Sequence, residues 1–111
     1  MTKRIKTDLL NLVDAMATAV IRYHTHQPPP TGLSPKEFEI GLNDNLNEMI
    51  KMCPVTKSVP IRWAIAQVYS VHHFLLMNPE LAEIILKSFD QVFQLTHEAR
   101  EAWDIKPLTN D

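Results

Sequence analysis

The segment that most constrains the fold covers residues 60–77, PIRWAIAQVYSVHHFLLM, because it has too little polar surface to face water. Projected as a helix at about 100° per residue, its polar residues form one narrow strip and its apolar residues cover most of the remaining circumference. A helix of this kind is surrounded by partners, which are either other helices of this chain or a second copy of the chain. We therefore expect a central, largely buried helix over 60–77.

Three amphipathic helices are expected around it, over about 5–24, 35–52 and 79–103, because apolar residues recur there in steps of three and four. The start of the second of these is marked by Ser34-Pro35-Lys36-Glu37, which combines a capping box with proline at the first helical position. Gly41 lies inside the same helix, where it costs up to about 1 kcal/mol relative to alanine, and this indicates a close backbone contact.

The prolines separate these helices. The segment QPPPTG, residues 27–32, ends the first helix and predicts a stiff spacer, although a proline-rich recognition segment is the alternative. Asn78 and Pro79 predict a very tight turn between the last two helices. Residues 104–111 are polar and are expected to form a flexible tail. The sequence therefore predicts a single domain over 1–111, with an all-α fold and a four-helix bundle whose third helix is largely buried.

Charge and cysteine content restrict the class of protein. The chain has 111 residues and a formal net charge of −2, which gives no electrostatic reason to expect a nucleic-acid surface. Its only basic cluster, Lys3, Arg4 and Lys6, is interpreted as a solvated helix end. The single cysteine, Cys53, cannot form an internal disulfide, and this fits a reducing compartment, so we expect a cytoplasmic protein. Residues 60–77 carry an arginine and two histidines, so no membrane span is expected.

Five histidines raise the question of a metal site, but their spacing does not favour one. His24 and His26 are two residues apart, and His72 and His73 project about 100° apart, so neither pair chelates from one helix face. His72 lies among apolar residues and is interpreted as a core or interface histidine that needs a hydrogen-bond partner. His97 and Glu101 have the spacing of a surface pair. No metal and no cofactor are expected.

The residues that carry catalysis in other helical proteins are also not arranged for it here. Glu80 and Glu83 form a pair with the spacing of magnesium ligands, as do Glu98 and Glu101, but the pairs lie on one helix roughly 27 Å apart at 1.5 Å per residue. One ion cannot bridge them. Cys53 has no histidine near it in sequence and is interpreted as a buried structural thiol. We therefore expect a protein that is not an enzyme.

The leading hypothesis is a small non-catalytic interaction protein with an adaptor, regulatory or assembly role. It would bind a protein partner or a second copy of itself, most simply as a homodimer, through apolar surface beyond what one helix seam requires. The aromatic residues expected at this interface are Trp63, Phe74, Phe89, Phe93 and Trp103.

Two other hypotheses remain open. One is a site for a small ligand or metal inside the bundle, lined by His72 and by His24, His26 or His97. The last is a nucleic-acid-binding regulator that uses the basic residues Lys3, Arg4, Lys6 and Arg22. It is ranked third because the candidate recognition helix begins Pro79-Glu80-Leu81, with an acidic residue where it would meet phosphate.

Overall fold

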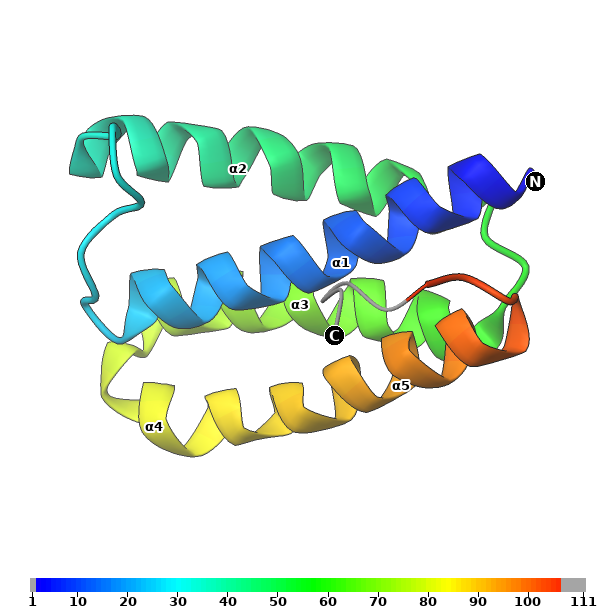
Figure 1. Ribbon diagram of the computed structural model, residues 1–111. Coiled ribbons are helices and arrows are strands. Elements are labelled where there is room, and N and C mark those ends of the chain that lie inside the picture. Colours follow the sequence, from blue (N-terminus) through cyan, green and yellow to red (C-terminus); the bar gives the residue numbers. More distant parts are fainter. Residues whose placement is uncertain (1, 107–111) are drawn as a thin grey trace.

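The computed structural model describes residues 2–106, and within this range the chain forms helices and no strand. The four long helices alternate in direction, as Figure 1 shows. They are α1 (Lys3–His24), α2 (Pro35–Lys51), α3 (Val59–Met77) and α5 (Phe89–Ala102). Three short pieces connect the last two: η1 (Pro79–Leu81), α4 (Ala82–Ile85) and η2 (Leu86–Ser88). The predicted all-α class and four-helix bundle are confirmed.

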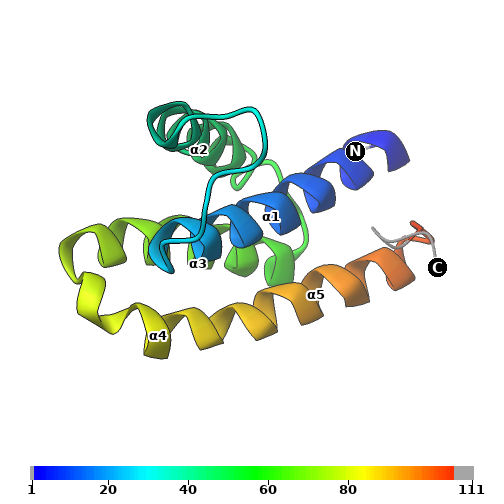
Figure 2. The ribbon, with the colours of Figure 1, turned by 60° about the vertical axis from the view of Figure 1, so that its left-hand side comes forward.

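Helices α1 and α3 form the middle of the bundle. Each of them packs against the other three long helices, whereas α2 and α5 lie on opposite sides of this central pair (Figures 1 and 2). A single hydrophobic core joins all four, with fully buried side chains such as Leu10, Leu46, Ile65 and Phe89. Among residues 2–106, no helix has both the length and the apolar character needed to cross a bilayer.

Side-chain caps explain where two of the helices begin. Ser34 Oγ accepts a hydrogen bond of 3.1 Å from the Glu37 backbone N–H, and Glu37 Oε1 accepts one of 3.1 Å from the Ser34 N–H. The predicted capping box is therefore confirmed. Helix α3 begins at Val59, one residue before the expected start, because Ser58 Oγ accepts from the Ile61 N–H at 3.3 Å.

Helix α3 buries one face, whereas the sequence predicts that most of its circumference is buried. The residues that it buries in the core are Ile61, Ala64, Ile65, Val68, Val71, His72 and Leu75. The side chains of Trp63, Phe74, Leu76 and Met77 are exposed, although the sequence places them in the enclosed set. The physical reason is that α1, α2 and α5 supply neighbours for the inner side of α3, and the residues that the structure describes leave much of its outer side uncovered.

The last predicted helix, 79–103, is broken into segments. The 3₁₀ turns η1 and η2 tighten the backbone on either side of α4, and regular α-helix resumes only at Phe89. Gln67 Nε2 donates to Ser88 Oγ at 3.0 Å, which ties the second of these turns to α3. Sequence periodicity did not reveal the breaks, because the apolar spacing continues through them.

Two smaller expectations are wrong. Among the described residues, no atom beyond its chain neighbours and the backbone of its own helix lies within 4 Å of a Cβ placed on Gly41, so the expected close backbone contact is not there. The segment after α5 is not a free tail from residue 104 onward, since Ile105 is buried and its N–H donates to the Arg100 carbonyl at 2.8 Å. The rest of the expected tail, 107–111, lies outside the described residues.

Candidate functional site

The outer side of α3 carries a row of residues at alternating steps of four and three, which we call the outer seam. It consists of Trp63, Gln67, Ser70, Phe74 and Met77, and of these Gln67 is half-buried and hydrogen-bonded to Ser88. The side chains of Trp63, Phe74 and Met77 are 40%, 44% and 82% exposed. This spacing is typical of a helix that packs lengthwise against another helix, because it keeps one row of side chains facing the partner.

Charged side chains lie beyond the two ends of the outer seam. Arg62 is exposed in the first turns of α3. Glu80 and Glu83 are exposed in η1 and α4, just beyond the other end of the helix. The seam therefore has a cation at its start and carboxylates at its finish.

The structure separates the five aromatic residues predicted at an interface. Trp63 and Phe74 are in the outer seam. Phe89 is 1% exposed inside the core, so its placement at an interface is wrong. Phe93 and Trp103 are half-buried against the core, and Lys6 Nζ lies 4.9 Å from the Trp103 ring centroid. The difference arises because α5 turns its apolar face inward against α1 and α3.

His72 forms a buried pair with a histidine from another helix. Its Nδ1 lies 3.0 Å from His24 Nε2, so one ring nitrogen donates and the other accepts. Burial first, and then the neighbouring His24 and His73, together lower the pKa of His72 from its usual 6.5 to about 4. Burial, and then the nearby His26, also lower the pKa of His24. His72 is therefore a core histidine with a satisfied hydrogen bond, as one of the sequence interpretations has it.

The other histidines do not converge on this pair. His26 is exposed in the loop after α1, and His97 forms a surface pair with Glu101 at 3.0 Å, as its spacing predicts. Among residues 2–106, no three side chains of His, Cys, Asp or Glu are placed to hold a metal ion. Cys53 is half-buried rather than buried, and its Sγ lies 3.7 Å from the Arg62 carbonyl oxygen.

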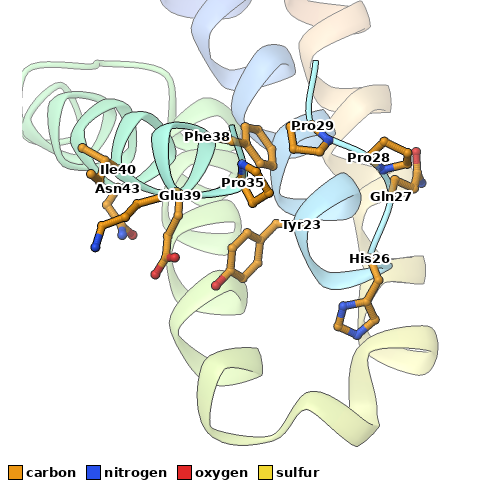
Figure 3. A pocket seen from close by; sticks show the side chains of 11 residues that line it. Tyr23, His26, Gln27, Pro28, Pro29, Pro35, Phe38, Glu39, Ile40 and Asn43 are labelled. Carbon is orange, nitrogen blue, oxygen red and sulfur yellow. The ribbon is translucent and has the colours of Figure 1, made fainter. Parts of the chain in front are cut away.

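A groove of about 850 Å³ lies beside the histidine pair, where the end of α1 meets the start of α2. Tyr23 lines it, and the ring centroid of Tyr23 is 5.6 Å from that of His72 and 6.4 Å from that of Phe38. Figure 3 shows His26 and Glu39 on either side of Tyr23, with Pro28 and Pro29 above. The Pro28 carbonyl accepts a hydrogen bond of 2.6 Å from Arg22 Nη1, so the chain itself holds this proline segment between α1 and α2.

Sequence reasoning missed a buried ion pair between α1 and α5. Asp14 Oδ2 accepts from Arg100 Nη2 at 2.7 Å, and Asp14 Oδ1 accepts from Thr96 Oγ1 at 2.6 Å. All three side chains are buried. The available signal was a charged residue within an apolar stripe on each helix.

The basic residues of the nucleic-acid hypothesis are not gathered on one surface. Arg22 lies about 27 Å along α1 from Arg4 at 1.5 Å per residue, so it does not extend the basic cluster at the start of α1.

Comparisons with protein families, with curated proteins and with solved structures found no match for this chain.

Proposed function

We propose that this protein is a non-catalytic interaction module that self-associates through the outer seam of α3 to form a two-fold homodimer. The observation that carries the proposal is the exposure of Trp63, Phe74 and Met77 along one row of α3. Large apolar side chains gathered on one face are typical of interaction surfaces. A dimer of this kind serves an adaptor, regulatory or assembly role.

The arrangement of the seam supports a second copy of the chain as the occupant. Ser70 lies at its middle, with Trp63 seven residues before it and Met77 seven residues after it. Antiparallel pairing of two α3 helices about Ser70 therefore brings Trp63 opposite Met77 of the partner subunit. The small serine at the crossing allows the two helix axes to approach closely. A two-fold interface requires this kind of self-complementary patch.

The charges beyond the seam support the same pairing. An antiparallel arrangement brings the start of one α3 beside the end of the other, so that Arg62 approaches Glu80 of the partner subunit. Both side chains are exposed in the single chain. Opposite charges at the rim of an interface favour one register and orientation over others.

The test compares the wild type with Phe74→Glu and with Ile40→Glu as the matched control. Ile40 is also exposed, but it lies on α2 and outside the seam. Sedimentation equilibrium across micromolar concentrations should give a dimer for the wild type and Ile40→Glu, and a monomer for Phe74→Glu. Far-UV circular dichroism confirms that each variant is folded. A monomeric wild type, or equal dissociation of the two variants, would overturn the proposal.

A further inference from the structure

The first turns of α1, the end of α5 and the residues that follow it border an open pocket of about 520 Å³, which we call the terminal pocket. Its lining is unusually cationic, with side chains from Lys3, Arg4, Arg100 and Lys106. Thr7 and Asn11 add a hydroxyl and an amide from the same face of α1. The pocket lies at the other end of the bundle from the histidine pair, as the course of α1 in Figure 1 shows.

The cations in the pocket outnumber the carboxylates. Arg100 is already paired with Asp14, so its charge is balanced. Among the lining residues that the structure describes, three cations remain, Lys3, Arg4 and Lys106, against the single carboxylate of Asp104. Lys3 Nζ lies 3.6 Å from Asp104 Oδ2, but both side chains are well exposed, so water screens this contact. Within residues 2–106, the lining of the terminal pocket therefore carries an excess of two positive charges.

The position of these cations on α1 increases the local positive potential. The partial charge at a helix N-terminus is already positive, so acidic residues are the stabilising choice there. The first turn of α1 has no acidic residue and instead carries Lys3 and Arg4. A local preference that is broken in this way is often found at a functional site.

Arg100 gives the pocket a fixed donor. It is 4% exposed, and its Nη2 is held by Asp14, which Thr96 holds in turn. A guanidinium has five N–H donors in a rigid fork, and Asp14 is the acceptor that the described part of the chain provides for it. Arg100 also lines the terminal pocket. This planar fork matches the oxygens of a phosphate group.

We infer that the terminal pocket binds a small phosphate-bearing anion, with Arg100 as the fixed donor and Lys3 and Arg4 as the mobile cations. A dianionic phosphate group matches the excess of two charges. Free phosphate and a phosphate monoester share this chemistry, and the two are distinguished by experiment. The site is independent of the outer seam and of dimer formation.

The test is calorimetric titration of the full chain with inorganic phosphate and, separately, with glycerol phosphate, at low ionic strength. The variants are Lys3→Gln and Arg4→Gln, whose side chains are exposed, and the matched control is Lys87→Gln, an exposed lysine in η2 outside the pocket. Each pocket variant should weaken binding about tenfold, as the loss of a charge-assisted contact implies. Lys87→Gln should bind as the wild type does.

Binding of inorganic phosphate alone identifies free phosphate as the ligand, and tighter binding of glycerol phosphate identifies a monoester; either result supports the site. The inference is overturned if neither compound binds more tightly than chloride at equal ionic strength. It is also overturned if Lys87→Gln weakens binding as much as Arg4→Gln, because the attraction would then come from the general charge of the surface.

Discussion

His24 Nε2 lies 3.0 Å from His72 Nδ1, in a buried contact between the end of α1 and the last turns of α3. When both rings are neutral, one of these two nitrogens carries a proton and donates a hydrogen bond to the other, so both polar atoms are satisfied. Two cationic rings cannot, because both nitrogens would then donate and two like charges would be buried together. The pair therefore links protonation to the packing of the two central helices.

The first prediction is a loss of stability in mild acid. The pKa of His72 is lowered to about 4 from its usual 6.5, and the pKa of His24 is lowered as well. Between these values the unfolded chain binds more protons than the folded one, so the free energy of unfolding falls as the pH drops from about 6.5 through 4. The stabilisation is complete above pH 6.5. Urea denaturation measured at a series of pH values checks this.

The variant His72→Asn isolates the effect of the pair, since its amide places a hydrogen-bonding atom where Nδ1 lies. In His72→Asn the free energy of unfolding should depend less on pH between about 6.5 and 4. The surface variant His97→Gln should show the same pH dependence as the wild type. The neighbouring groups that titrate are His73 on α3 and His26 in the loop, and the carboxylate of Glu39 on α2 lies near Tyr23. Equal pH dependence in His72→Asn and the wild type would contradict the prediction.

The second prediction concerns the buried ion pair. Replacing Asp14 by Leu leaves the Arg100 guanidinium buried without its carboxylate, which should cost about 3–5 kcal/mol of unfolding free energy. The double variant Asp14→Leu, Arg100→Met removes both charges and should be more stable than either single variant. Denaturant titration of the three variants closes a double-mutant cycle. Additive losses would show that the two side chains are not coupled.

The third prediction uses the two glycines as a matched pair. Gly41→Ala should raise the unfolding free energy by about 0.5–1 kcal/mol, because the site is helical and has open space around it. Gly32→Ala should lower it, since Gly32 has φ of +92°, a conformation in which a side chain is strained. Thermal unfolding of both variants measures the difference. A destabilised Gly41→Ala would indicate an unrecognised contact at that position.

Local features of the fold could be predicted from the sequence, and contacts between distant residues could not. The capping box at Ser34 and the helix periodicities depend on neighbours within a few residues, so they are visible in the chain itself. The need of His72 for a buried partner was also visible. That the partner is His24 depends on how α1 lies against α3, which no spacing within one helix specifies.

The residues of the candidate interface could also be predicted only in part from the sequence. Trp63 and Phe89 are both aromatic residues on apolar helix faces, yet the first is exposed and the second is in the core. Which face turns inward is decided by tertiary packing, because α1 and α3 take the two central places and α5 has only one side to bury. Sequence patterning predicted excess apolar surface but assigned part of it to the wrong helix.

The last prediction tests the orientation of the proposed dimer. Antiparallel pairing of the outer seams places Arg62 near Glu80 of the partner subunit, and the two-fold axis repeats this contact. Reversing one charge with Arg62→Glu converts two attractions into two repulsions and should weaken dimerisation, since an exposed pair contributes about 0.2–1 kcal/mol. The double variant Arg62→Glu, Glu80→Arg restores opposite charges and should dimerise nearly as the wild type does. Sedimentation equilibrium at low salt measures the dimer dissociation constants of the wild type and the two variants. Raising the salt concentration should reduce the differences between these constants. A double variant as weak as Arg62→Glu alone would exclude this register, because only in an antiparallel pairing does position 62 of one copy approach position 80 of the other.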